Sequence, residues 1–204
     1  MYQRFFKRFL DVLLSLCALI VLSPALLALA LLVRKNLGSP VIFHQDRPGK
    51  DEKIFRLCKF RSMTDARDEN GNLLPDAERL TGFGRKLRAT SLDELPELWN
   101  ILKGDMSIVG PRPQLVRDMV FMTPDQRRRH TVRPGLTGWA QVNGRNILLW
   151  EDRLRYDLEY IDRVSFREDV KIVIMTVGCL FRHDDVATEG MDTSEDLGDY
   201  LLRV

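Results

Sequence analysis

The longest apolar stretch of the chain runs from Phe9 to Val33 and contains one charged residue, Asp11. Ser23-Pro24 interrupts this stretch near its middle. Proline inside a helix removes one backbone hydrogen bond and clashes with the preceding turn, so the pattern predicts two helices with a break between them. Basic residues flank both ends of the stretch, namely Arg4, Lys7 and Arg8 before it and Arg34 and Lys35 after it.

The basic residues at both ends of the stretch indicate its membrane topology. Membrane segments keep their positive flanks on the cytoplasmic side, so both ends of the stretch are expected there. The prediction is a re-entrant helix–break–helix over residues 1–36, with the membrane break at Ser23 and Pro24. Asp11 is expected to reach lipid headgroups or to pair with Arg8.

Two alternatives stay open for this stretch. Its 25 residues would measure roughly 38 Å as a helix, which is enough to span a bilayer, and spanning helices tolerate proline. A core helix of a soluble protein would be apolar as well. A cleaved signal peptide is disfavoured, because its apolar core is usually about 7–15 residues and no small-residue cleavage site follows Val33.

Beyond the apolar stretch, the pattern changes to short segments. Pro40–Gln45 and Lys53–Phe60 are predicted strands, and the turn signal at Arg47–Asp51 joins them into a β-hairpin. Residues 64–84 are polar and are expected to form a surface loop. Apolar spacing predicts helices at Leu95–Leu102, Gln114–Met122, Leu148–Arg163 and Val170–Phe181, the last being a core or interfacial helix. The fold class predicted is therefore α+β and mostly helical.

The domain organisation predicted from this pattern has three parts. The membrane segment is followed by one domain over residues 37–188 and by an acidic, peripheral C-terminal tail over residues 189–204. Within the domain, residues 132–145 are rich in glycine, and Gly135, Gly138 and Gly144 are expected to let a ligand approach the backbone closely.

Composition excludes several classes of protein. The net charge of +2 is nearly balanced, which argues against a nucleic-acid binder. Three scattered cysteines without a CxxC pair support neither a zinc site nor a disulfide framework, and no histidine pair has ligand spacing. Arg127, Arg128 and Arg129 form a basic run whose simplest interpretation is a solvated helix face.

The candidate chemistry centres on the adjacent carboxylates Asp93 and Glu94. Ser91 followed by Glu94 fits a capping box, with Ser91 as the N-cap. Alternatively, Pro96 takes the first helical position, and both carboxylates lie in the preceding turn. Either arrangement places backbone donors near Asp93, which would hold it ionised as a nucleophile or as a ligand for a hard divalent cation.

Several cations are candidates for binding phosphate near these acids. Pro111 and Pro113 restrain the backbone around Arg112, and a pre-positioned guanidinium suits bidentate phosphate recognition. Other candidates are Arg88, Lys59 at the end of the second strand, and Arg145 at the end of the glycine-rich segment. From the residues alone, surface ion pairs are the favoured interpretation of this set, and a phosphate-binding site is the alternative.

The motifs together resemble a known family, the small monotopic phosphoglycosyl transferases, also called bacterial sugar transferases. The resemblance covers residues 1 to roughly 185 and lies in Ser23-Pro24 and six further motifs in order: Lys59-Phe-Arg-Ser-Met63, Ser91-Leu-Asp-Glu-Leu-Pro96, Lys103-Gly-Asp-Met-Ser107, Gly110-Pro-Arg-Pro113, Arg133-Pro-Gly-Leu-Thr-Gly138 and Gln141-Val-Asn-Gly-Arg145. It implies a monotopic membrane protein with a re-entrant helix, amphipathic interfacial helices and a small β-hairpin.

The resemblance also implies a reaction. A sugar 1-phosphate moves from a UDP-sugar to undecaprenyl phosphate and UMP is released, by a ping-pong mechanism with a phosphosugar–aspartate intermediate on Asp93. Glu94, together with Asp93, would bind Mg²⁺. Arg112 and its flanking prolines would hold phosphate, with Arg88, Arg145 and Lys59 as further contacts.

The implied setting is the cytoplasmic face of the bacterial inner membrane, at the first membrane step of glycoconjugate assembly. The partners expected are the UDP-sugar, undecaprenyl phosphate, the phospholipid membrane and downstream glycosyltransferases; a homodimer is compatible with the sequence. Two other hypotheses are a Mg²⁺-dependent phosphohydrolase with water as the acceptor and a non-catalytic membrane scaffold.

Overall fold

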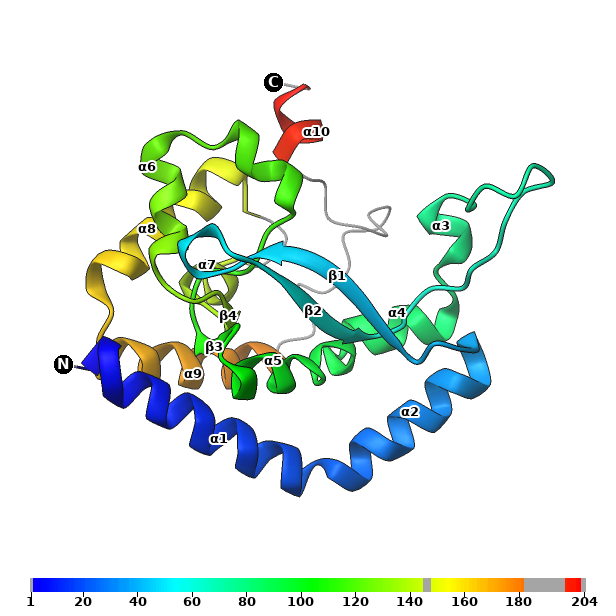
Figure 1. The fold of residues 1–204 in the computed structure, drawn as a ribbon, viewed down its shortest axis with the longest axis horizontal. Coiled ribbons are helices and arrows are strands. Elements are labelled where there is room, and N and C mark those ends of the chain that lie inside the picture. The colour runs from blue at the N-terminus through cyan, green and yellow to red at the C-terminus, as the bar shows by residue number, and fades with distance from the viewer. Residues whose placement is uncertain (1, 145–147, 182–196, 203–204) are drawn as a thin grey trace.

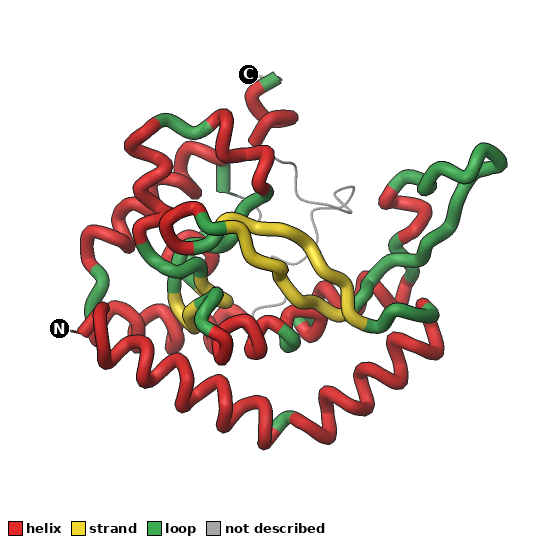
Figure 2. Tube along the Cα trace, in the orientation of Figure 1, coloured by secondary structure: helices red, strands yellow, loops and turns green. Residues whose placement is uncertain are grey.

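The computed structural model describes residues 2–144, 148–181 and 197–202. Helices dominate this part of the chain, and strands are confined to one hairpin and one short pair (Figure 2). The α-helices are α1 (Lys7–Val21), α2 (Ser23–Leu37), α3 (Asp76–Arg79), α4 (Gly82–Ala89), α5 (Glu97–Lys103), α6 (Pro124–Arg127), α7 (Trp139–Val142), α8 (Trp150–Arg163), α9 (Phe166–Phe181) and α10 (Leu197–Leu201). The prediction of a mostly helical α+β fold is confirmed.

Helices α1 and α2 form a wide V along one side of the molecule, and the remaining elements lie within it (Figure 1). The two helices are bent by 65° at the break. Pro24 lies in the first turn of α2, where its missing N–H needs no partner, and the Ser23 hydroxyl donates to the Ile20 carbonyl at 2.8 Å. The break predicted at Ser23-Pro24 is confirmed.

The length of this helix pair bears on the membrane alternatives. Among the described residues, no single helix is both long and apolar enough to cross a bilayer. The pair Lys7–Val21 and Ser23–Leu37 meets that test only when its two halves are taken together.

The V has a packed inner face and an apolar outer face. On the inner face, Val33 and Leu37 are buried against Phe60 and Leu87. The outer face exposes large apolar side chains, namely Phe5, Phe6, Phe9, Leu13, Leu14, Leu16, Ile20, Val21, Leu27, Leu31 and Leu32. A core helix buries its apolar side chains, so the exposed face does not fit the soluble-core alternative.

The polar residues at the start of α1 face the protein. Asp11 is only 4% exposed, and its Oδ1 accepts hydrogen bonds from the Ser107 hydroxyl at 3.0 Å and the Ile108 N–H at 2.9 Å. Arg8 instead donates to two carbonyls at the C-terminal end of α5, at 2.6 and 2.9 Å. The expectation that Asp11 reaches headgroups or pairs with Arg8 is therefore wrong, because unpaired backbone groups of the body take both side chains.

The predicted β-hairpin is confirmed. Strands β1 (Ile42–Pro48) and β2 (Ile54–Phe60) pair antiparallel, with Ile42 opposite Phe60, and a 3₁₀ turn at Lys50–Glu52 joins them. The fully buried Asn100 ties α5 to β2, since its side chain accepts from the Cys58 N–H at 2.9 Å and donates to the Arg56 carbonyl at 2.8 Å.

A short parallel pair, β3 (Ser107–Val109) and β4 (Gly135–Thr137), was not predicted. Its glycines serve backbone packing. A Cβ on Gly135 would lie 2.1 Å from the Gly110 nitrogen, and one on Gly138 would lie 2.2 Å from the Gly110 oxygen. A Cβ on Gly144 would meet the Leu148 side chain at 2.9 Å. These glycines therefore admit neighbouring parts of the chain, and the expected approach of a ligand stays a prediction.

Other predicted elements differ in detail. The segment 64–84 contains α3 and the first residues of α4 instead of a continuous loop, and Gln114–Met122 forms a 3₁₀ turn at Val116–Phe121. The remaining 3₁₀ turns are Leu92–Glu94 and Arg128–Thr131, and Tyr2–Phe6 forms one turn of π-helix. The predicted helix Leu148–Arg163 is confirmed as α8.

The C-terminal tail is not wholly peripheral. Leu197 in α10 is buried with Met122, Trp150 and Leu154, and its N–H donates to Asp118 Oδ1 at 3.2 Å. An apolar side chain at residue 197 thus draws the end of the chain onto α8, which corrects the expectation for that part of residues 189–204. Residues 189–196 lie outside the described part of the chain.

Candidate active site

The carboxylates Asp93 and Glu94 lie in the 3₁₀ turn Leu92–Glu94, and α5 begins three residues later at Glu97. Ser91 has a left-handed backbone with φ of 55° and makes no side-chain cap, so the predicted capping box does not form. Pro96 immediately precedes the first residue of α5. The arrangement is close to the second alternative, in which both acids lie in the turn before the helix.

Glu94 is the centre of an ion-pair cluster. Its Oε1 lies 2.7 Å from Lys59 Nζ at the end of β2 and 2.5 Å from Arg112 Nη2 beyond β3. Burial alone would favour the neutral acid, but Arg112 and Lys59 together hold the pKa of Glu94 well below its usual range. The structure thus brings together three of the predicted site residues around an ionised carboxylate.

Glu97 is a member of this cluster that sequence reasoning missed. Its side chain comes from the first turn of α5, is almost fully buried, and places Oε1 3.2 Å from Lys59 Nζ. That oxygen completes no hydrogen bond with any described residue. Burial raises the pKa of Glu97, with Lys59 opposing the shift. No local pattern marks Glu97 as a site residue, because Glu94 lies in the 3₁₀ turn before α5 and the two acids do not share a face of one helix.

Asp93 differs from both glutamates. It is 7% exposed, and its carboxylate takes part in no hydrogen bond or ion pair with another described residue. Burial raises the pKa of Asp93, while Lys59, Arg112 and Arg88 act in the opposite direction. The backbone donors expected to hold Asp93 ionised are absent from the described contacts, because the 3₁₀ turn directs its N–H groups elsewhere. The nearby cations favour the ionised form but offset the effect of burial only in part.

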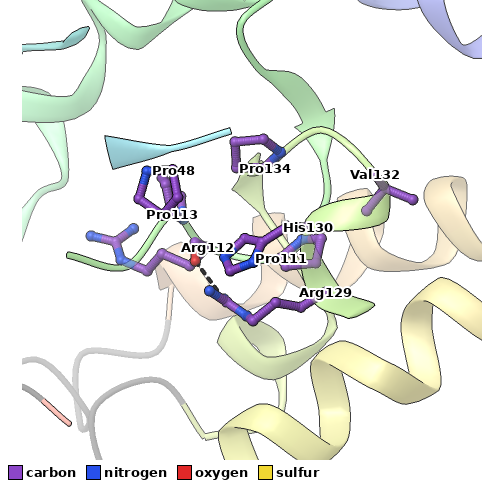
Figure 3. Close-up of a pocket in the computed structure, with 8 residues that line it drawn as sticks. All are labelled: Pro48, Pro111, Arg112, Pro113, Arg129, His130, Val132 and Pro134. Atoms are coloured by element: carbon purple, nitrogen blue, oxygen red, sulfur yellow. Dashed lines mark hydrogen bonds between the residues drawn. The ribbon is translucent and has the colours of Figure 1, made fainter. Parts of the chain in front are cut away.

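The proline-flanked segment (Figure 3) places Arg112 beside Glu94. The Arg112 side chain remains 41% exposed while it binds Glu94. The carbonyl of Pro111 accepts from the Gly135 N–H at 2.9 Å, and the carbonyl of Pro113 accepts from Arg47 Nη1 at 3.2 Å. Arg47, assigned from sequence only to a turn, is thus a second residue of the site region that was missed.

The remaining predicted cations have different outcomes. Arg88, on α4, donates from Nε to the buried Ser62 hydroxyl at 2.9 Å and is near enough to Asp93 to lower its pKa. Arg145 lies outside the described residues, so its predicted contact with phosphate stays a prediction.

A divalent cation would find hard oxygen donors here. Within the described ranges, no three His, Cys, Asp or Glu side chains gather closely enough to form a complete metal site. Mg²⁺, however, usually binds through one or two carboxylates plus substrate phosphates and waters. The unpartnered carboxylate of Asp93 and the adjacent Glu94 fit that incomplete shell, although Lys59 and Arg112 compete for Glu94.

Comparison with known proteins shows the family of the chain. The family model described as bacterial sugar transferase matches residues 2–183. The sugar transferase EpsL of Bacillus subtilis is 51% identical over 171 residues, which cover 84% of this chain and 85% of EpsL. The UDP-glucose:undecaprenyl-phosphate glucose-1-phosphate transferase of Escherichia coli is 42% identical over 86% of this chain and 40% of its own length.

A third relative transfers a different sugar according to its name. The UDP-N-acetylgalactosamine-undecaprenyl-phosphate N-acetylgalactosaminephosphotransferase of Aeromonas hydrophila is 39% identical over 85% of this chain and 43% of its own length. The chain therefore spans most of EpsL but only about two fifths of the other two relatives. The match of the family model over nearly the whole chain confirms the predicted resemblance, and the chain belongs to the bacterial sugar transferase family.

Proposed function

We propose that the protein transfers a sugar 1-phosphate from a UDP-sugar to undecaprenyl phosphate and releases UMP. The names of the relatives from E. coli and A. hydrophila support this donor and this acceptor class. The single observation that carries the residue assignment is Asp93, a buried carboxylate left without a hydrogen bond among described residues beside a fully paired Glu94. Evolved sites keep a group unpaired where it has to react.

The reaction proceeds in two displacements. An Asp93 carboxylate oxygen attacks the β-phosphorus of the UDP-sugar, the bond from that phosphorus to the bridging oxygen breaks, and UMP leaves. A phosphate oxygen of undecaprenyl phosphate then attacks the same phosphorus, and the bond to Asp93 breaks. This restores the carboxylate and yields the undecaprenyl diphosphate sugar, as expected of covalent catalysis with ping-pong kinetics.

The cations around Asp93 have two tasks in this scheme. Lys59 and Arg88 favour the ionised form of Asp93 that acts as nucleophile, against the effect of burial. The exposed part of Arg112 is directed to the phosphates of the donor, where a guanidinium offsets negative charge as the phosphoryl group transfers.

Mg²⁺ would be held by Asp93 and Glu94 together with the donor phosphates, and when bound it neutralises charge on the diphosphate. Because Glu94 is already bound to Lys59 and Arg112, its carboxylate also fixes these two cations relative to one another. Glu94 thus orders the site in addition to its predicted part in binding the metal.

The site would lie at the cytoplasmic face of the bacterial inner membrane, with the V of α1 and α2 inserted as a re-entrant segment. The apolar outer face of the V and the exposed Arg34 and Lys35 at the end of α2 support this topology. Labelling of single cysteines placed at residues 2 and 36 in intact cells tests it. Accessibility of the two positions from opposite sides would rule out the re-entrant arrangement.

The activity itself is tested by UMP release from the full chain in detergent with a panel of UDP-sugars and Mg²⁺. The expected result is one stoichiometric turnover at most without undecaprenyl phosphate and sustained turnover with it. Sustained release without the lipid would indicate hydrolysis instead. No release with any donor would leave the scaffold hypothesis and overturn the proposal.

A further inference from the structure

Three adjacent arginines that look equivalent in the sequence have different environments. Arg127 pairs with Glu52 in the hairpin turn. Arg128 pairs with Asp125 and with Asp162 on α8, and its side chain is 46% exposed. The Arg129 side chain, in contrast, is 1% exposed. The interpretation of the run as a solvated helix face is wrong for Arg129, and its burial requires a separate explanation.

Arg129 connects α8 to the proline-flanked segment. Its Nε and Nη2 donate to Asp157 Oδ2 on α8 at 3.0 and 2.7 Å, and the Asp157 side chain is 2% exposed. The same Nη2 donates to the backbone carbonyl of Arg112 at 2.7 Å. Figure 3 shows the Arg129 side chain directed at this carbonyl from below the recess between the prolines. Asp157 therefore fixes the guanidinium, and the guanidinium fixes Arg112.

Because of the two prolines, the segment 111–113 is held in place mainly through its carbonyl groups. Pro111 and Pro113 have no N–H, so the segment 111–113 offers three carbonyls but only one backbone donor. Each of the three carbonyls accepts from a different element: Pro111 from Gly135 in β4, Arg112 from Arg129, and Pro113 from Arg47 in β1. The backbone position of Arg112, from which its side chain reaches Glu94, thus depends on contacts with distant parts of the chain.

Stability alone is a poor explanation for the Arg129–Asp157 pair. Removing two charges from water costs several kcal/mol per ion, and apolar residues of similar volume usually stabilise a core at least as well. Arg129 also donates a hydrogen bond to the backbone carbonyl of Arg112 in a loop. This contact restrains the position of the loop more than it adds to the buried surface area. The ion pair beside it, Arg128–Asp162, has no such contact with the segment 111–113 among the described residues.

We propose that Arg129, held in place by Asp157, is a positioning residue that sets the Arg112 guanidinium for the transferred phosphate. This inference rests on the proposed function, in which Arg112 binds the donor phosphates. Arg129 has no direct contact with the reacting atoms in this scheme; it acts through the carbonyl of Arg112.

The test compares Arg129→Gln and Asp157→Asn with the matched pair Arg128→Gln and Asp162→Asn. All are measured as full chains, at a temperature where thermal unfolding shows each variant to be folded. We expect kcat to fall about 10- to 100-fold for the buried pair, as for misplacement of a binding group by a fraction of an ångström, and to stay within about twofold for the exposed pair. Equal activity of Arg129→Gln and Arg128→Gln would overturn the proposal.

A double-mutant cycle separates positioning from a general loss of structure. If Arg129 acts through Arg112, Arg129→Gln in an Arg112→Ala background lowers kcat by no more than about twofold, because the group that it positions is gone. A purely structural role predicts that the full 10- to 100-fold loss adds to that of Arg112→Ala. Additive losses would therefore contradict the proposal.

Hydrogen exchange of residues 107–116 gives a readout that needs no activity. Arg129→Gln and Asp157→Asn should speed exchange in this segment relative to Arg128→Gln, while exchange in α1 stays unchanged. Unchanged exchange in the segment overturns the positioning role. If the wild-type chain releases no UMP while the two variants still show the faster exchange, the proposed function is overturned and the positioning of Arg112 stands.

Discussion

Two buried aspartates, Asp11 and Asp93, define two regions of the molecule: a fixed region around Asp11 and the region around Asp93 that we propose to be reactive. Asp11, where α1 meets β3, accepts hydrogen bonds from Ser107 and Ile108. Asp93, where β2 meets α5, is buried to a similar degree and accepts none from the described residues. Both aspartates lie at a junction between elements and are almost equally buried, so burial does not explain their difference.

The difference shows that a buried aspartate side chain can have either a structural or a chemical role. A buried carboxylate that satisfies backbone and hydroxyl donors stabilises the junction between elements, because those donors would otherwise be unpaired. A buried carboxylate surrounded by cations without a direct hydrogen bond retains lone pairs for an incoming phosphorus or metal. Substitutions at the two positions should therefore have opposite effects on stability and on activity.

The largest effect is expected for Asp93→Asn, which should lower turnover by at least about 10³-fold, since the nucleophile is removed. The same variant should be more stable than the wild type at neutral pH. Burial raises the pKa of Asp93 in the folded state, so above that pKa the ionised group costs folding free energy that the unfolded chain does not lose. The cost disappears below the unfolded pKa of about 3.9.

Thermal unfolding in detergent at several pH values measures the second half of this prediction. The melting temperature of Asp93→Asn should exceed that of the wild type at pH 7, and the gap should close as the pH falls toward 4. Substantial residual turnover would remove Asp93 as the nucleophile. A variant that is less stable at pH 7 would show that Asp93 holds structure, as Asp11 does.

Asp11→Ala should lower the stability of the protein and leave its activity nearly unchanged, and this effect is of intermediate size. Loss of the acceptor leaves the Ser107 hydroxyl and the Ile108 N–H without their partner, at a cost of about 2–4 kcal/mol in the free energy of unfolding. That corresponds to a drop of roughly 5–15 °C in melting temperature for a chain of this size. The kcat of the folded fraction should remain within about twofold of the wild type, as measured by UMP release.

Asp11→Asn is the matched control, because the amide keeps an oxygen at the position that accepts both bonds. It should retain most of the stability. If Asp11→Ala were as stable as the wild type, the junction between α1 and β3 would be held by its apolar contacts alone. If Asp11→Ala were stable but inactive, Asp11 would be needed for activity and not for stability, which would contradict the structural role that we infer for it.

Sequence patterns predicted the features that depend on neighbouring residues. Proline geometry fixed the break at Ser23-Pro24, alternation and a turn signal predicted the hairpin, and helical spacing predicted α8. Each of these follows from rules that act within a few residues. The carboxylates Asp93 and Glu94 were proposed as site residues for the same reason, since the motif that contains them is contiguous.

The features that were missed depend on contacts between distant residues. The parallel pair of β3 and β4 joins residues 28 positions apart, with Ser107 opposite Gly135. The Arg129–Asp157 pair likewise spans 28 residues, and nothing in a run of three arginines distinguishes the one that is buried. Glu97 has its role only because β2 brings Lys59 beside α5. Tertiary placement determines these three, and short-range patterns contain no information on it.

The smallest predicted effect concerns Lys59, which belongs to the reactive region because it favours the ionised form of Asp93. Burial raises the pKa of Asp93 and Lys59 is the strongest opposing influence, so Lys59→Met should raise that pKa further. The acid limb of the profile of kcat/KM against pH should then move to higher pH, and activity at pH 7 should fall about tenfold. Lys59→Arg, which keeps the charge, should restore most of the wild-type profile.

Lys103→Met is the control for this comparison, since Lys103 pairs with Asp105 at the other end of α5 and its side chain is 47% exposed. It removes the same charge from the chain but leaves the Asp93 carboxylate and its neighbours in place, so its pH profile should match that of the wild type. An acid limb that moved equally in both variants would reflect net charge alone. An acid limb that moved in neither would mean that Asp93 is kept ionised by Arg112 and Arg88, and the reactive region would then be defined by the arginines and not by Lys59.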